Sequence, residues 1–114
     1  MMKKRKIKSN ILPDKKKTYE KIAEDATIDC YGEYEQISGW ACLLDDCIHT
    51  PCNCVLGKEK AVLEKICTDD NGNVVIGVIK LNKTKVRVLI QDIILDNQKE
   101  MDYINAYAYW CKEG

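Results

Sequence analysis

The sequence predicts a small α+β domain, because the spacing of its apolar residues changes twice along the chain. Apolar residues recur first at helical spacing, then in short β-branched runs, and near the end again at helical spacing. This order favours an N-terminal helical hairpin, a small curled antiparallel sheet of the SH3-like half-barrel type, and a C-terminal helix. With 114 residues, of which 46% are hydrophobic and 32% charged, the chain suffices for one core and is too short for two.

Two helices are expected in the first half. Residues 18–31 have a helical pattern that ends at Gly32. A second helix carries one apolar stripe at spacings i, i+3, i+4, i+7 and i+11, formed by Ile37, Trp40, Ala41, Leu44 and Ile48. Pro51 ends this second segment.

Four antiparallel strands and a last helix are expected to follow. The strand segments are rich in β-branched residues and cover 52–56, 61–68, 73–81 and 85–90. Residues 69–72 read Asp-Asp-Asn-Gly, a hairpin turn signal, and residues 91–95 are predicted to form a single tight turn. Asp96 or Asn97 then caps the last helix, with Glu100 placed for a capping box from Asn97.

The charges divide the chain into a basic arm and an acidic body. Residues 1–17 hold eight bases and one acid, a net of +7, whereas residues 18–114 hold ten bases and seventeen acids, a net of −7. We expect residues 1–17 to be a disordered arm and residues 18–114 to be the folded domain. The acidic body attracts cations, and the arm attracts polyanions.

The sequence also indicates where the protein works. No apolar run approaches the roughly 18 residues of a membrane span, and residues 1–17 lack the apolar core of a secretory signal. We therefore expect a cytoplasmic protein with no membrane partner.

Seven cysteines raise the question of zinc. In a reducing compartment we expect them to be reduced and mostly buried, with Cys52 and Cys54 on one face of a strand. The alternative is a zinc site made by Cys42, Cys47, Cys52 and Cys54. These spacings contain no C-x2-C pair, and His49 is the only histidine.

Catalytic motifs are missing from the sequence. It has no G-x-S-x-G nucleophile turn, no phosphate-binding glycine loop and no H-E-x-x-H. Histidine-based acid–base chemistry would depend on His49 alone. We therefore predict that the protein is not an enzyme.

Carboxylate side chains are more numerous than cysteine or histidine, and they suit calcium, which takes six to eight oxygen ligands. The acidic residues form four clusters: Asp29, Glu33 and Glu35; Asp45 and Asp46; Asp69 and Asp70 with Asn71; and Asp92 and Asp96. An EF-hand starting at Asp69 is excluded, because Val74 would replace the required glycine and Lys80 the bidentate glutamate.

One segment of the sequence resembles a known family. The string Ile28-Asp29-Cys30-Tyr31-x-Glu33-x-Glu35-x3-Gly39-Trp40-x3-Leu44-Asp45-Asp46-x-Ile48-x2-Pro51 resembles the calcium-binding protein family known from cyanobacteria as CcbP. The resemblance extends over roughly residues 20–114 and leaves out the basic arm. It implies a small acidic protein that binds Ca²⁺ without an EF-hand and serves as a buffer or sequestering protein.

Two departures from the family pattern concern the candidate ligands. Cys52 and Cys54 stand where the family tends to have Phe and a small residue, which favours a core role for them. The turn at Asp69 is also shorter and less acidic than the usual family loop.

Eight residues are the candidate calcium ligands, in two half-sites. Glu35 and Asp45 are ten residues apart, about 15 Å along one helix, so they cannot share an ion without another element. One half-site joins Asp29, Glu33 and Glu35 to a partner such as the C-terminal helix. The other joins Asp45 and Asp46 to Asp69, Asp70 or Asn71, and we rank it first because helix C-termini favour cations.

A function of another class is also consistent with the sequence. Residues 3–17 could clamp nucleic acid, in a module built on a small barrel.

Overall fold

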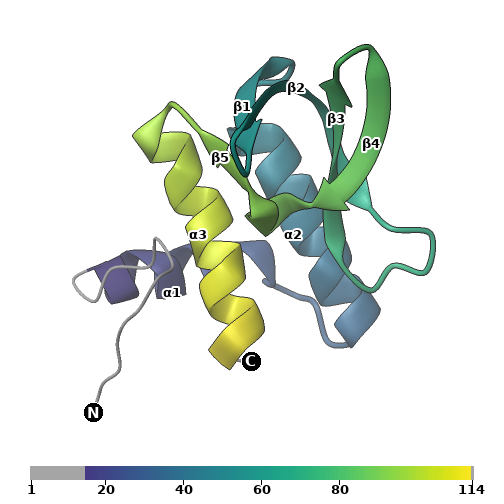
Figure 1. Ribbon diagram of the computed structural model, residues 1–114. Helices are drawn as coiled ribbons and strands as arrows, with labels where there is room; N and C mark the ends of the chain where they lie inside the picture. Colours follow the sequence, from purple (N-terminus) through teal and green to yellow (C-terminus); the bar gives the residue numbers. More distant parts are fainter. Residues whose placement is uncertain (1–14, 114) are drawn as a thin grey trace.

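The computed structural model describes residues 15–113 and has three helices and a five-stranded antiparallel sheet (Figure 1). The elements are, in order, α1 (Lys16–Ala26), α2 (Glu33–Cys47), β1 (Cys52–Leu56), β2 (Glu59–Thr68), β3 (Val75–Leu81), β4 (Thr84–Leu89), the 3-10 turn η2 (Ile90–Asp92), β5 (Ile93–Leu95) and α3 (Gln98–Glu113). The predicted α+β class is confirmed.

The sheet has the strand order β4-β3-β2-β1-β5. It curls in Figure 1 but stays open, because the edge strands β4 and β5 pair only with β3 and β1. The strand β5 corrects the prediction of a single tight turn over 91–95. Ile93 and Leu95 are buried and pair with β1, while Ile94 between them is exposed. Three residues are too few for this alternation to be recognised in the sequence.

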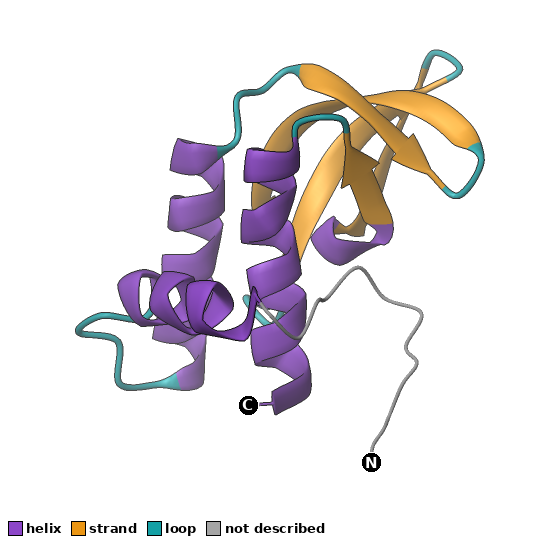
Figure 2. Ribbon diagram, turned by 90° about the vertical axis from the view of Figure 1, so that its left-hand side faces the viewer, coloured by secondary structure: helices purple, strands orange, loops and turns teal. Residues whose placement is uncertain are grey.

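The helices form a layer on one side of the sheet. Figure 2 shows α2 and α3 side by side, with α1 lying across them. The first two helices therefore do not form the helical hairpin that the sequence predicted. α1 begins at Lys16, so Lys16 and Lys17, which were predicted to belong to the basic arm, are helical. Residues 1–14 of the arm lie outside the described residues.

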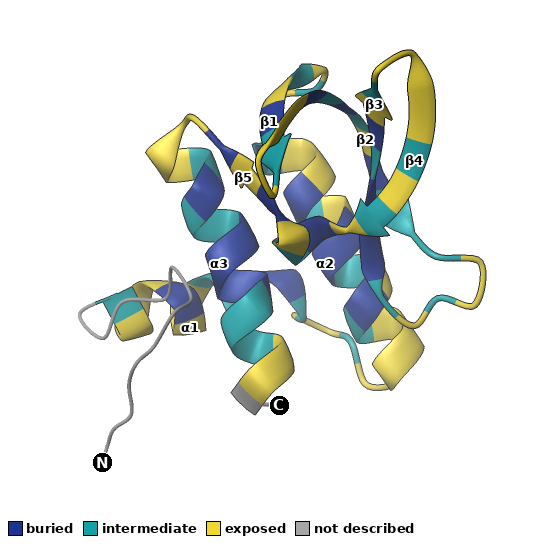
Figure 3. Cartoon of the chain, in the orientation of Figure 1, coloured by how far each residue is buried: buried dark blue, intermediate teal, exposed yellow. Residues whose placement is uncertain are grey.

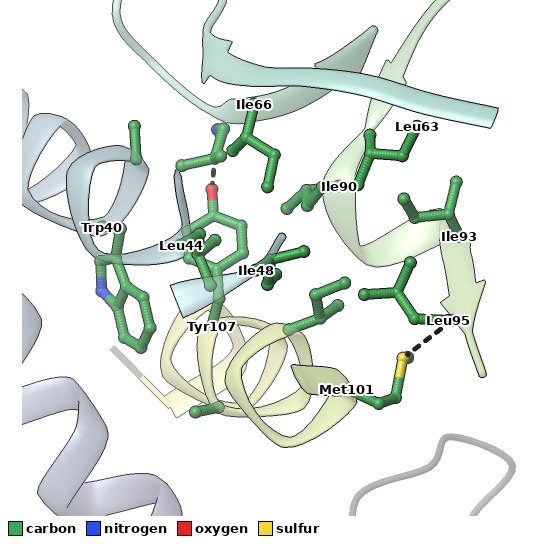
Figure 4. Close-up of a cluster of buried hydrophobic side chains, with 14 of the residues drawn as sticks. Trp40, Leu44, Ile48, Leu63, Ile66, Ile90, Ile93, Leu95, Met101 and Tyr107 are labelled. Atoms are coloured by element: carbon green, nitrogen blue, oxygen red, sulfur yellow. Dashed lines mark hydrogen bonds between the residues drawn. The ribbon is translucent and has the colours of Figure 1, made fainter. Parts of the chain in front are cut away.

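The core lies between this helical layer and the sheet (Figure 3). All five residues of the predicted apolar stripe of α2 are buried. Trp40 packs edge-on against Tyr107 of α3, with ring centroids 5.3 Å apart. The buried Tyr107 hydroxyl accepts a hydrogen bond of 3.0 Å from the backbone N–H of Val75, which fastens β3 to α3 (Figure 4).

The N-terminus of α3 is capped by one of the two expected residues. The Asn97 Oδ1 accepts a hydrogen bond of 3.0 Å from the Glu100 N–H. The Glu100 carboxylate contacts His49, at 2.7 Å from Nδ1 and 3.3 Å from the backbone nitrogen. The expected capping box is thus half formed, since the side chain of Glu100 is occupied by His49.

All seven cysteines are free thiols. Cys54 is buried, Cys42 and Cys111 are exposed, and Cys30, Cys47, Cys52 and Cys67 are half-buried. The prediction that most cysteines are buried is therefore wrong. Cys42 shows why, because it lies off the apolar stripe of α2, on the side that faces solvent.

Candidate metal site

The β2–β3 turn is closed by the carboxylate of Asp69. Its Oδ1 accepts hydrogen bonds from the backbone N–H groups of Asn73 (2.7 Å) and Val74 (3.2 Å). The Gly72 N–H donates to the carbonyl of Asp69 at 3.0 Å, and Gly72 has a φ of +70°. Local structure therefore explains the sequence of the turn, because Asp69 supplies the hydrogen-bond acceptor and Gly72 adopts the left-handed conformation.

This turn packs against the first turn of α2. A Cβ atom on Gly72 would lie 3.4 Å from the Tyr34 ring. A cavity of about 390 Å³ lies at this contact. It is lined by the start of α2, by the turn and by the end of α3: Glu33, Tyr34, Ile37, Gly72, Asn73, Val74, Tyr107, Trp110 and Cys111. The structure therefore places Glu33 opposite the β2–β3 turn.

The other predicted ligands near the start of α2 and the β2–β3 turn either have hydrogen-bonding or ionic partners or have a constrained backbone. The Glu35 Oε1 accepts hydrogen bonds from the N–H groups of Tyr31 (3.0 Å) and Gly32 (3.1 Å) at the start of α2. Asp70 forms an exposed ion pair of 3.2 Å with Arg87. Asp29 has a φ of +60° in the segment between α1 and α2. Glu35 thus has a structural role, and the exposed pair of Asp70 is weak.

Asp45 and Asp46 lie at the opposite end of α2, where both are exposed. Asp45 follows Tyr34 by eleven residues, which is about 16 Å along the helix. Since Tyr34 is the contact point of the β2–β3 turn, the structure does not bring Asp45 and Asp46 to Asp69, Asp70 or Asn71. It brings Glu33 there instead.

No preassembled metal cage is seen among residues 15–113. Within them, no three His, Cys, Asp or Glu side chains are arranged to hold a metal ion. Among these residues, Cys42, Cys47, Cys52 and Cys54 of the zinc alternative do not form such a group. Burial raises the pKa of the Cys54 thiol, and burial with Glu100 and Asp96 nearby raises that of Cys52, which opposes the thiolate that zinc requires.

A metal site at the β2–β3 turn that uses oxygen ligands would combine ligands of several kinds. Glu33 and the turn residues Gly72, Asn73 and Val74 offer a carboxylate, a side-chain amide and backbone carbonyls. Calcium accepts these oxygens together with water. Asn73 could not be recognised from the sequence, because its position opposite Glu33 depends on how the turn packs on α2.

No helix in the described part of the chain is long and apolar enough to cross a membrane.

Three helices layered on one side of an open five-stranded antiparallel sheet define the class of fold to which the chain belongs. Neither a family model nor a curated protein matches the sequence. Among solved structures, the chain is similar to the crystal structure of Anabaena CcbP, with a TM-score of 0.73 and 18% identity over 91% of this chain and 95% of that one.

A calcium-binding protein in its calcium-binding form is similar too, with a TM-score of 0.74 and 17% identity over 91% of this chain and 98% of that one. The predicted resemblance to CcbP is thereby confirmed for the fold.

Proposed function

We propose that this protein binds calcium through carboxylate, amide and carbonyl oxygens, without an EF-hand. The observation that carries the proposal is the fold, which matches nearly the full length of two solved structures, one of them a calcium-binding protein in its calcium-binding form. The net charge of −7 on residues 18–114 supports it independently, because such a body concentrates divalent cations around itself.

The proposed site lies between the first turn of α2 and the β2–β3 turn, where Glu33 and Asn73 line the cavity and Asp69, Asp70 and Asn71 belong to the same turn. Two backbone amides already orient Asp69, so that little side-chain entropy is lost when an ion binds. The positive end of the α2 dipole opposes a cation here. It amounts to about half an elementary charge, however, against a full charge on each carboxylate.

Asp45 and Asp46 form a second candidate position. The negative end of the α2 dipole favours a cation there. The β2–β3 turn lies at the other end of the helix, so its oxygens are too far away to complete a site with Asp45 and Asp46. We therefore infer that this position binds calcium more weakly than the first.

Calorimetric titration of the full chain with CaCl₂ tests both positions. Glu33→Gln with Asp70→Asn removes two charges at the first site, and Asp45→Asn with Asp46→Asn removes two at the second. We expect the first pair to weaken binding by more than about tenfold and the second by less than about threefold, since each lost charge-assisted contact is worth about 1.5–3 kcal/mol. The reverse result moves the site to the end of α2.

Unchanged binding in both variants, with the fold verified by circular dichroism, contradicts the proposal of a carboxylate site at either end of α2.

The finer parts of the proposal are a buffering or sequestering role and a cytoplasmic location. The turn and α2 are already in contact, so binding requires little rearrangement, as suits a buffer. Seven free thiols suit a reducing compartment.

The calcium-binding neighbours favour a protein that is not an enzyme. The order β4-β3-β2-β1-β5, with a 3-10 turn between β4 and β5, supports an SH3-like half-barrel.

A further inference from the structure

A groove between α1 and α3 lies outside the candidate calcium site. Its volume is about 420 Å³, within the range of ligand pockets. Lys17, Lys21 and Ile22 line it from one face of α1, and Lys99, Asp102 and Tyr103 line it from α3.

The groove is positively charged within an acidic body. Asp102 is already engaged, because both of its oxygens accept from Lys15 Nζ (2.9 and 2.8 Å) and one also accepts from Gln98 (3.3 Å). Lys17, Lys21 and Lys99 form no ion pair with any residue in the described part of the chain. Three uncompensated ammonium groups thus surround one hollow, although residues 18–114 hold seventeen acids.

The groove also has an apolar side. Ile22 and the Tyr103 ring are both half-buried. The Tyr103 side chain packs against the hydrophobic core, which holds the ring in place. A fixed aromatic ring beside cationic side chains is the combination with which proteins bind single-stranded nucleic acid: bases stack on the ring, and lysines contact phosphates.

We propose that this groove binds single-stranded nucleic acid, with Lys17, Lys21 and Lys99 on the phosphates and Tyr103 stacked on a base. An acidic polypeptide or an anionic lipid headgroup would satisfy the lysines but would not stack on the ring. The basic arm strengthens the attraction, because it joins the domain at Lys15, whose ammonium group is bound to Asp102 beside the groove.

The test is fluorescence anisotropy of a labelled 12-mer of oligothymidylate with the full chain over a series of salt concentrations. Lys17→Gln, Lys21→Gln and Lys99→Gln together remove the groove charges. The matched control is Lys58→Gln, Lys60→Gln and Lys83→Gln, which removes three exposed charges from the β1–β2 and β3–β4 hairpins of the sheet. Both variants keep residues 1–14, so the contribution of that basic segment is the same in each.

We expect the groove variant to bind more than about tenfold more weakly, with a salt slope smaller by about two to three, while the control changes by less than about twofold. Tyr103→Leu should weaken binding by about fivefold or more, and Tyr103→Phe, which keeps the ring, should bind like the wild type. Thermal melts verify that each variant is folded.

Three results would overturn the proposal: no binding at low salt, equal losses in the two lysine variants, or equal binding by Tyr103→Leu and Tyr103→Phe. Competition by polyglutamate or by anionic vesicles as effective as that by unlabelled oligonucleotide would assign the groove to another anionic partner and equally contradict it.

Discussion

Gly39 and Trp40, the most recognisable pair of the sequence, serve packing. A Cβ atom on Gly39 would lie 2.2 Å from the Ala26 carbonyl oxygen and 3.2 Å from the Cys30 sulfur. Only glycine therefore allows the end of α1 to approach α2 so closely. Trp40 is fully buried and packs on Tyr107 and Trp110 of α3. The Gly-Trp pair thus fixes how both other helices meet α2.

Substituting Gly39 should be costly for this reason. We expect Gly39→Ala to lower the free energy of unfolding by more than about 2 kcal/mol, because the added methyl meets backbone that cannot move aside locally. Gly32→Ala is the control. Its Cβ would meet only Glu35 Oε1 at 3.9 Å, so the loss should stay below about 1 kcal/mol. Equal losses in urea unfolding would show that the approach of the helices is not the cause.

Tyr107 makes stability depend on pH in the alkaline range. Burial is the main reason that the pKa of Tyr107 lies well above its usual value, and the hydrogen bond from Val75 opposes this shift only in part. The neutral hydroxyl is thus favoured in the folded state. Its contribution is fully present below the unfolded pKa near 10 and is lost as the pH rises above it. The raised thiol pKa values of Cys54 and Cys111 act in the same direction from about pH 9.

We therefore expect the free energy of unfolding, measured in urea from pH 7 to pH 11, to fall above about pH 9. Tyr107→Phe should start about 1–3 kcal/mol lower at pH 7, because the buried Val75 N–H loses its acceptor, and should then decline less steeply. Parallel curves for the two proteins would contradict this role of Tyr107.

At the scale of elements, the length of each helix or strand decided whether the sequence could predict it. The stripe of α2 repeats over five positions and marked the helix correctly, and β1 to β4 lie within two residues of their predicted ranges. β5 has three residues and was missed. The direction of α1 also could not be predicted. It depends on the close approach at Gly39 and on the ion pair of Lys15 with Asp102, whose partners are 87 positions apart.

The cap of α3 gives a test at this scale, since the sequence left two candidates. Asn97 accepts the hydrogen bond from the Glu100 N–H, so Asn97→Ala should lower the free energy of unfolding by about 1 kcal/mol. Asp96→Ala should change it by less than about 0.5 kcal/mol, as expected for an exposed residue outside the cap. Thermal or urea unfolding measures both, and a larger loss for Asp96→Ala would reverse the assignment.

At the scale of the whole molecule, the candidate site illustrates what a linear pattern cannot contain. The sequence identified the acidic clusters but paired Asp45 and Asp46 with the β2–β3 turn, from the favourable dipole at the end of a helix. Only the packing of Gly72 on Tyr34 shows that the turn lies at the other end of α2, opposite Glu33. Dipoles act within about one turn of a helix, whereas the choice of partner depends on how the sheet is placed on the helices.

The charge of the whole molecule leads to a prediction about calcium and stability. Bound calcium would offset the repulsion within a body of net charge −7, and a ligand bound to the folded state alone raises the free energy of unfolding by about 2.7 kcal/mol at a hundredfold excess over its dissociation constant. We expect CaCl₂ to raise the melting temperature well above its value in NaCl of equal ionic strength. MgCl₂ should have a smaller effect, because Mg²⁺ gives up its water reluctantly and demands octahedral geometry.

Glu33→Gln with Asp70→Asn should abolish the difference between CaCl₂ and NaCl, whereas Asp45→Asn with Asp46→Asn should preserve it. Equal stabilisation of the wild type by the two salts would mean that screening accounts for the whole effect, and that no specific site contributes to it.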